Sequence, residues 1–217
     1  MKNEAYPWCG IAGSLVFLLL VPLVARGQAS MIPPAFYAVE GAPFTATIES
    51  VWKGNSQTRP GRSLSRVVRD TAGRQRFEIP TIEEAMVTGQ QPHVVIYDPV
   101  MEKVIKLDML HRTAVVTPMT QVGRTIKIDP AVRRGFPCRA AQGGKSLGVR
   151  WVAGLETCGL GLPGRELWLS TNYLMPLMEV RSDMQRGELT QILMKLDVTE
   201  PDAELFEVPA GYSVVHP

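Results

Sequence analysis

Hydrophobic and polar residues alternate along most of the chain beyond its N-terminal fifth. In the first segment of this kind, Phe44, Ala46 and Ile48 share one parity and alternate with Thr45 and Thr47. Period-two alternation is typical of a β-strand that has one buried face and one face in water. The pattern predicts strands over residues 44–52, 64–69, 75–79, 93–98, 101–108, 112–117, 149–155, 165–170, 177–181 and 188–198.

The last of these strands has the most regular alternation. Thr190, Ile192 and Met194 share the parity that we assign to the buried face of the strand. Gln191 and Lys195 take the other parity, which we expect to face water. The strand is therefore predicted to have one apolar side and one polar side along its whole length.

A short apolar segment follows the last strand. Pro201 suits the first turn of a helix, where its missing N–H would be unbonded anyway, so we expect a helical turn over residues 201–206. Leu205, Phe206 and Tyr212 would then form an apolar plug that folds back onto one end of the sheet.

One further helix is expected over residues 82–87. Thr81, followed three residues later by Glu84, fits a capping box, in which each side chain accepts a hydrogen bond from the backbone N–H of the other residue. Upstream, Gly73 in the segment 70–73 can supply the positive φ that a hairpin turn requires.

Many short strands and little helix predict a mainly β fold. The spacing argues for a sandwich, a barrel or one large curved antiparallel sheet. Residues 118–146 break the alternation with proline, glycine and basic residues, so we expect a long loop there. No repeat and no second domain boundary is evident. Residues 43–217 are expected to form a single domain after a lead-in over residues 30–42.

The N-terminus predicts export. Residues 10–25 are sixteen residues without a charge, and Gly27 and Ala29 are the small residues that a signal peptidase reads. We expect residues 1–29 to be a signal peptide, cleaved after Ala29, and the protein to be periplasmic or secreted. The alternative is an uncleaved anchor, although this run is shorter than the roughly 20 apolar residues that span a bilayer.

Cleavage would leave two cysteines, Cys138 and Cys158. In an oxidising compartment, one disulfide between them is the simplest expectation. The alternative is a pair of unpaired thiols that fill space as small apolar residues.

The net charge of +2 is close to balance and gives no general attraction to nucleic acid, so no nucleic-acid partner is expected. Residues 59–76, however, carry six arginines, and residues 197–207 carry five acids. One interpretation is two solvated faces that pair with each other. The other is an arginine surface for an acidic partner or for anionic headgroups, with peripheral membrane contact. The candidate contact residues are Arg62, Arg66, Arg69, Arg74 and Arg76.

Sequence motifs for catalysis or metal binding are not found. The three histidines, at positions 93, 111 and 216, do not have the spacing of metal ligands on one element. The segment Gly144-Lys145-Ser146 ends like a phosphate-binding loop, but Arg139 occupies the position of its leading glycine. We therefore expect no enzyme activity, no metal and no cofactor.

Apolar side chains are the remaining candidates for a binding site. Eight methionines lie between Met86 and Met194, and methionine suits surfaces that accept varied apolar partners. The alternative is ordinary filling of the core. On a curved sheet, methionine and tryptophan would line a hydrophobic groove. The candidate ligand-binding residues are Trp52, Trp168, Met178, Met194 and Phe206.

The closing segment Thr199–Tyr212, TEPDAELFEVPAGY, resembles the closing motif of secreted bacterial proteins in the outer-membrane lipoprotein carrier (LolA/LolB-like) superfamily. The hairpin over residues 68–76 and the turn over residues 97–99 are similar to that group's pattern. The chain is most similar to uncharacterised secreted members. The resemblance implies an antiparallel half-barrel, partly filled by short helices, without catalytic residues. The low helix content and the loop over residues 118–146 depart from the carriers.

Two functions are compatible with this resemblance. The first is a non-enzymatic binding protein that holds a lipid, an acyl chain or a lipoprotein segment on an apolar concave face. The second is a protein-interaction or envelope-sensing module that contacts an envelope protein and has no small-molecule ligand. An open apolar face favours the first function, and a face filled by its own side chains favours the second.

Overall fold

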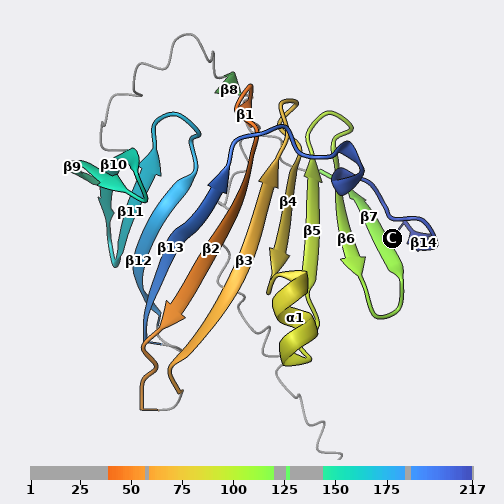
Figure 1. Ribbon diagram of the computed structural model, residues 1–217, viewed down its shortest axis with the longest axis horizontal. Coiled ribbons are helices and arrows are strands. Elements are labelled where there is room, and N and C mark those ends of the chain that lie inside the picture. Colours follow the sequence, from red (N-terminus) through yellow and green to blue (C-terminus); the bar gives the residue numbers. More distant parts are fainter. Residues whose placement is uncertain (1–38, 57–58, 120–125, 128–143, 184–186, 217) are drawn as a thin grey trace, which may run out of the picture. The chain divides into compact units, whose positions relative to one another are not determined.

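The computed structural model describes residues 39–56, 59–119, 126–127, 144–183 and 187–216 (Figure 1). All of them belong to one compact unit, which spans residues 32–217. The expected signal peptide, residues 1–29, lies outside the described residues, and its cleavage stays a prediction. Among the described residues, no helix is long and apolar enough to cross a membrane.

Twelve strands of the described chain form one sheet. They are β2 (Phe44–Trp52), β3 (Gly61–Arg69), β4 (Gln75–Ile79), β5 (His93–Asp98), β6 (Lys103–Asp108), β7 (Thr113–Pro118), β9 (Lys145–Val152), β10 (Leu155–Leu162), β11 (Arg165–Ser170), β12 (Pro176–Asp183), β13 (Gly187–Asp197) and β14 (Ser213–Val215). Their order in the sheet is β14-β7-β6-β5-β4-β3-β2-β13-β12-β11-β10-β9. A separate parallel pair joins β1 (Val39–Glu40) to β8 (Ile126–Lys127).

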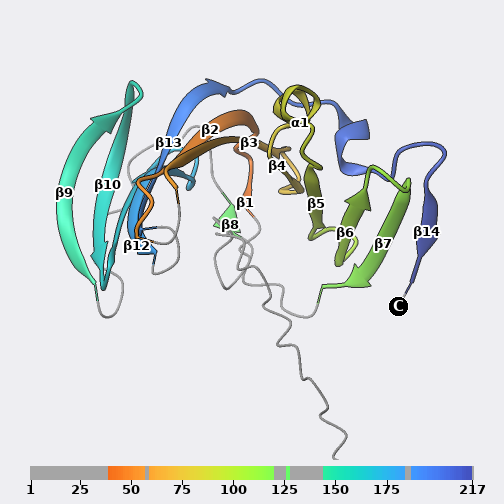
Figure 2. The same ribbon diagram turned by 90° about the horizontal axis from the view of Figure 1, so that it is seen from below.

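The twelve-stranded sheet is open and curved (Figure 2). Strands β9 and β14 form its two edges, and neighbouring strands are antiparallel except β14, which runs parallel to β7. One α-helix, α1 (Ile82–Thr88), connects β4 to β5. This is the half-barrel architecture that the closing motif implies, so the expected mainly β fold with a single curved sheet is confirmed.

Every strand predicted from the alternation is present, with ends shifted by a few residues. Two strands of the sheet were not predicted, β10 and β14. In β10, Gly159 and Gly161 occupy successive positions on one face, so the second half of the strand has no polar side chains there to alternate with Leu160 and Leu162. Strand β14 has only three residues, which is too short for a period to show.

The parity predicted for β13 is wrong. Leu189, Gln191 and Leu193 are its buried residues, whereas Met194 is exposed. The register of β13 against β2 shifts after Leu193, which leaves Met194 as an extra residue. A bulge of this kind reverses the parity of the residues beyond it. The prediction assumed one parity along the whole strand, whereas the buried parity changes at Met194.

The sheet has two faces, which we name after Phe44 and Ile96. On the Phe44 face, the register places Ala46 beside Val67 and Val67 beside Phe77. These three residues and Phe44 are buried, and the burial of Phe44 and Ala46 is what the alternation in β2 predicts. Residues of the opposite parity in the same strands lie on the Ile96 face.

The C-terminal tail packs on the Ile96 face. The buried cluster there contains Val68, Val94, Ile96, Ile105, Leu107, Ala114 and Phe206. Phe206 belongs to η2 (Ala203–Phe206), a 3-10 helix whose first turn is capped by the Asp202 carboxylate. Leu205 and Tyr212 pack against the same cluster. The expected helical turn and apolar plug are confirmed, and the plug lies over β3 to β7.

Polar contacts also hold the tail against the β3–β4 hairpin. Arg76 Nη1 donates a hydrogen bond to the carbonyl of Leu205 at 3.1 Å, and the Arg74 guanidinium lies 4.9 Å from the centre of the Phe206 ring. The Thr71 N–H donates to the Glu200 carboxylate at 3.1 Å. The acidic tail and the arginine-rich hairpin therefore meet, through these hydrogen bonds and a cation–π contact.

Helix α1 begins as the sequence predicts, but only half of the capping box forms. The Thr81 hydroxyl accepts from the Glu84 N–H at 3.2 Å. The Glu84 carboxylate instead accepts from the Leu64 N–H at 2.6 Å, and the Thr81 N–H donates to the Leu64 carbonyl at 2.9 Å. Both bonds join the start of the helix to β3. The Glu84 carboxylate and the Thr81 N–H, which would bond to each other in a complete capping box, therefore both pair with the backbone of Leu64.

Replacement of Thr81 by alanine is expected to lower the free energy of unfolding by ~1 kcal/mol, because the N-terminal N–H groups of α1 lose their side-chain acceptor. Urea unfolding followed by circular dichroism measures this difference. Thr88→Ala, in the last turn of the same helix, is the matched control and should change stability by less than about 0.5 kcal/mol. Equal losses in the two variants would contradict the capping role of Thr81.

Candidate functional site

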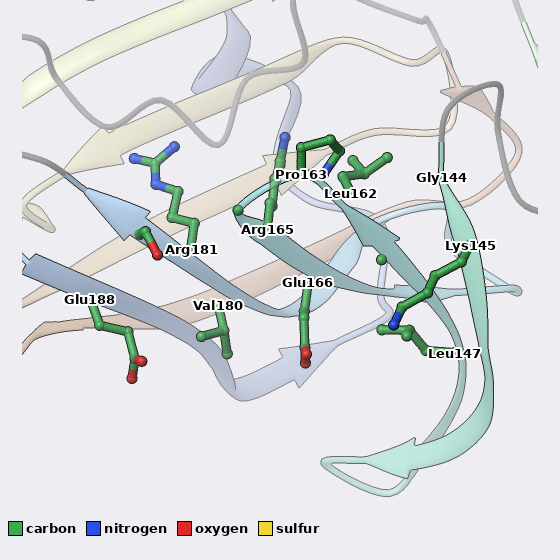
Figure 3. Close-up of a pocket in the computed structure, with 13 residues that line it drawn as sticks. Gly144, Lys145, Leu147, Leu162, Pro163, Arg165, Glu166, Val180, Arg181 and Glu188 are labelled. Carbon is green, nitrogen blue, oxygen red and sulfur yellow. The ribbon is translucent and has the colours of Figure 1, made fainter.

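A cleft of about 640 Å³ lies at one end of the sheet, around the turn between β10 and β11 (Figure 3). We call it the strand-end cleft. Its lining residues are Gly144, Lys145, Leu147, Gly161, Leu162, Pro163, Gly164, Arg165, Glu166, Val180, Arg181, Ser182 and Glu188. It combines charged side chains with apolar ones, and none of the ten candidate residues from the sequence lines it.

The charged side chains of the cleft are divided between the two faces of the sheet. Figure 3 shows Arg165 and Arg181 on one side of the strands, and Glu166, Val180 and Glu188 on the other. The register explains this division, because Arg165 and Arg181 are cross-strand partners, as are Glu166 and Val180 one residue further along. The cleft therefore has a cationic part on the Phe44 face and a mixed part on the Ile96 face.

A buried ion-pair cluster forms the cationic part. Glu179 is fully buried; its Oε2 accepts from Arg165 Nη2 at 2.9 Å, and its Oε1 lies 2.9 Å from Arg165 Nε. Arg181 Nη1 is 3.8 Å from the same Oε1, which is ion-pair contact beyond hydrogen-bond distance. One carboxylate thus serves two guanidinium groups.

This cluster contains polar atoms without hydrogen-bond partners. In the described chain, the buried atoms Arg165 Nε, Arg181 Nε, Glu179 Oε1 and Gln191 Oε1 have none; the close approach of Arg165 Nε to Glu179 Oε1 is an ion pair without hydrogen-bond geometry. Buried polar groups are almost always paired, and an unpaired one costs about 1–3 kcal/mol. Four of the seven buried side-chain atoms without a partner in the described chain lie in this cluster, so hydrogen bonding is least complete here.

Two glycines of β10 leave room for neighbouring side chains on the Ile96 face, and one of them, Gly161, lines the cleft. A side chain at Gly159 would overlap the Trp168 ring and the Leu147 Cβ, at less than 3 Å from both. One at Gly161 would lie 3.0 Å from the Lys145 side chain. Trp168, Leu147 and Lys145 lie across β10 because these glycines leave room for them.

Only two of the five predicted ligand-binding residues come together. Trp168 and Met178 are cross-strand partners on the Ile96 face, whereas the register places Trp52 on the Phe44 face, with the parity of Phe44. Met194 is exposed at the bulge of β13, and Phe206 is buried in the tail cluster. The expected groove lined by methionine and tryptophan is therefore not assembled from these residues.

Trp168 and Met178 also have an internal partner. The Arg150 guanidinium lies 3.7 Å from the centre of a Trp168 ring, and Arg150 Nη2 donates to the Met178 sulfur at 2.6 Å. Trp168 is buried. Arg150, on the edge strand β9, therefore covers this pair and occupies the space in which an apolar ligand would contact it.

The five predicted arginines do not form one contact surface. Arg69 and Arg76 are buried, so they are removed from the predicted surface. The other three each form an ion pair within the chain: Arg62 with Glu49, Arg66 with Glu83 and Arg74 with Asp70. Most of these acids lie far from the arginines in sequence, so the sequence showed the positive charges without the groups that neutralise them.

Arg69 shows why a charged residue is tolerated inside the sheet. Burial lowers the pKa of its guanidinium to about 9. The side chain donates to the carbonyl of Ala42 at 2.9 Å and to that of Tyr173 at 2.5 Å, and it lies 4.5 Å from the centre of the Phe44 ring. These contacts join β3 to the turn after β11, so the role of Arg69 is to stabilise the fold.

The predicted disulfide stays a prediction. Cys158 is buried on β10, and Cys138 lies outside the described residues. Within the described residues, no group of three histidine, cysteine or carboxylate side chains could hold a metal ion.

The sequence pattern does not mark Arg165, Glu179 and Arg181 as site residues. The available signal is weak: Glu179 stands between Met178 and Val180 in an apolar segment, where an acid on a buried parity needs a nearby cation. The cation that meets it comes from the preceding strand, at a position that only the register of β11 and β12 specifies.

Comparison with known proteins gives structural matches only. No protein-family model and no curated protein matches the sequence. An uncharacterised conserved protein from Thermus thermophilus matches with a TM-score of 0.50 and 16% identity, over 81% of this chain and 91% of that one. The shared fold is a half-barrel made of one open, curved sheet. The low identity means that this match shows the fold and nothing about a ligand.

Two further structural matches have lower TM-scores. MucB, in the MucA/MucB complex of Pseudomonas aeruginosa, has a TM-score of 0.45 and 17% identity; the match covers 81% of this chain and 59% of that one. A LolA superfamily protein from Nitrosomonas europaea has a TM-score of 0.33 and 7% identity, over 80% and 92% of the two chains. At these values the likeness is one of overall architecture and carries no argument about function.

Proposed function

We propose that this protein is an exported, non-enzymatic binding protein of the bacterial envelope, and that the strand-end cleft holds an amphipathic ligand such as a lipid, an acyl chain or a lipoprotein segment. The predicted signal peptide supports a periplasmic or secreted location. The cleft replaces the methionine and tryptophan groove as the proposed binding site, and it needs no metal or cofactor.

The observation that carries this proposal is the mixed lining of the cleft. Leu162 and Pro163 offer apolar contact beside Arg165 and Arg181, and Leu147 and Val180 extend the apolar lining on the other face of the sheet. Sites for small molecules are concave and combine apolar walls with a few polar groups that fix orientation. At about 640 Å³, the cleft is within the size range of such sites.

Ligand extraction tests the proposal. The protein is exported with its own signal peptide, purified from the periplasm, and extracted with organic solvent for mass spectrometry of bound lipid. The purified protein is then titrated with a pyrene-labelled dodecanol, a neutral amphiphile. We expect bound lipid, or uptake of the probe by emptied protein. Protein that is empty and also fails to take up the probe would overturn the proposal.

Leu162→Glu places a carboxylate on an apolar wall of the cleft and is expected to weaken binding of the neutral probe by roughly tenfold or more, since burial of one leucine side chain contributes about 1.5–3 kcal/mol. Val100→Glu is the matched control, because Val100 is exposed in the turn between β5 and β6. Equal affinity of the two variants would show that the probe binds elsewhere.

The second candidate function, a protein-interaction or envelope-sensing module, is favoured by the edge strand β9. Val149 and Trp151 are large apolar residues on this strand, and Trp151 is 71% exposed. An edge strand offers backbone groups to an extended peptide of an envelope protein.

Trp151→Lys should abolish capture of such a partner from periplasmic extract and leave probe binding unchanged. Capture that survives the substitution would exclude β9 as the contact edge.

A further inference from the structure

We propose that the strand-end cleft recognises the anionic head of its ligand, a carboxylate or a phosphate, through Arg181, and that the Arg165–Glu179 pair positions Arg181 for this contact. The inference rests on the proposed binding function and specifies the class of ligand. It follows from the hydrogen bonds, burial and charge around Glu179.

The two arginines beside Glu179 differ in their pairing. Arg165 faces both carboxylate oxygens, with Nη2 to Oε2 and Nε to Oε1 each 2.9 Å apart. Arg181 approaches only one of these oxygens, at 3.8 Å. The buried Nε atoms of both arginines lack a hydrogen-bond partner among the described residues, so the difference lies in the terminal nitrogens: Arg165 Nη2 donates to Glu179, whereas Arg181 Nη1 makes only the longer contact. Arg165 is thus fixed by Glu179, whereas Arg181 retains donors for another acceptor.

Among the side chains that the structure describes on this side of the strands, two guanidinium groups share one carboxylate, so positive charge exceeds negative charge there. The other lining acids do not neutralise this excess: Glu166 and Glu188 point to the opposite side of the strands in Figure 3, and Glu188 is already paired with Lys53 at 2.6 Å. A partly buried, uncompensated cation favours binding of an anion.

The geometry of a guanidinium limits the kind of anion. Its planar array of N–H donors matches the two oxygens of a carboxylate or a phosphate, and a charge-assisted pair of this kind is stronger than a neutral hydrogen bond. Arg181 lines the cleft, and its cross-strand partner Arg165 is itself opposite Leu162 on β10. An anionic head at Arg181 therefore places the start of an apolar tail near Leu162 and Pro163.

The Arg165–Glu179 pair has a positioning role in this arrangement. Glu179 is held opposite Gln191 by the register of β12 and β13, and it is fully buried. Because Arg165 supplies its closest cationic contact, loss of Arg181 leaves Glu179 paired. Arg181 can therefore be replaced without exposing an unpaired buried carboxylate, which makes it the residue to test.

The experiment compares Arg181→Met with Lys106→Met in the otherwise intact protein. Lys106 is exposed on β6, outside the cleft, and its replacement removes the same charge. Binding of a pyrene-labelled dodecanoate and of the matching pyrene-labelled dodecanol is measured by fluorescence titration. Arg181→Met is expected to weaken dodecanoate binding by roughly tenfold, the effect of one charge-assisted hydrogen bond, and to leave dodecanol binding unchanged. Lys106→Met should change neither.

The outcomes separate this inference from the proposed function. Failure of the wild-type protein to bind either probe overturns the proposed function. Equal affinity for the two probes, or an equal loss in the two variants, overturns the anion inference and leaves the proposed function intact. Competition by inorganic phosphate distinguishes the source of the anion: displacement of dodecanoate at low phosphate concentration indicates a site for free anions, whereas no displacement indicates that the head is recognised only with its apolar tail.

Discussion

Replacement of Glu179 by glutamine is expected to lower the free energy of unfolding by about 3–5 kcal/mol, the loss typical when one partner of a buried ion pair is removed. Glu179 is fully buried and is the carboxylate that contacts both Arg165 and Arg181. Glutamine keeps the size of the side chain but removes its charge. Two guanidinium groups would then face each other across β11 and β12 without a neutralising acid.

Chemical unfolding in urea, followed by tryptophan fluorescence, measures this loss. Glu166→Gln is the matched control, because Glu166 is exposed on the adjacent strand β11 and should change stability by less than about 0.5 kcal/mol. A triple variant, in which Arg165, Glu179 and Arg181 are all replaced by methionine, should recover much of the loss, since apolar residues of similar volume often replace a buried ion-pair cluster without cost. A loss under about 1 kcal/mol in Glu179→Gln would show that the cluster is solvated rather than buried.

Replacement of Phe206 by alanine is expected to destabilise the protein by about 3–5 kcal/mol, the range for truncation of a buried phenylalanine. Phe206 is 1% exposed and lies in the cluster on the Ile96 face together with residues of β3, β5, β6 and β7. The substitution removes the ring that Arg74 covers and leaves a cavity between the tail and the sheet.

The measurement is urea unfolding combined with limited proteolysis of the tail. Val198→Ala is the control, because Val198 is a half-exposed residue of the segment between β13 and η2. We expect Phe206→Ala to increase cleavage within residues 198–212 at low urea, whereas the control should behave like the original protein. Unchanged stability and cleavage would mean that the polar contacts of Arg76 and Thr71 suffice to hold the tail.

The strands were predictable because their pattern is local. In β2, Phe44, Ala46 and Ile48 alternate with threonine, and the structure buries these three residues as expected. The same rule failed in β13, where the extra residue Met194 reverses the parity. A bulge depends on the partner strand, so the sequence of β13 alone does not show it.

The candidate site was mostly not predictable. Trp168 and Met178 come together because β11 pairs with β12, but the sequence does not reveal that Arg150 from β9 covers them. Arg69 and Arg76 belong to an arginine-rich segment that suggested a cationic surface, yet both are buried. Their partners, carbonyls of Ala42, Tyr173 and Leu205, come from distant parts of the chain.

The sequence by itself determined the mainly β fold, the start of α1 at Thr81 and the apolar tail that ends in Tyr212, because each depends on residues that are close together in the chain. The tertiary structure alone decided which residues share a face and which charges meet. Arg165, Glu179 and Arg181 form one cluster only because β11 and β12 align in a particular register. Register is set by contacts across the whole sheet, and a shift of one residue would turn each of these side chains to the opposite face.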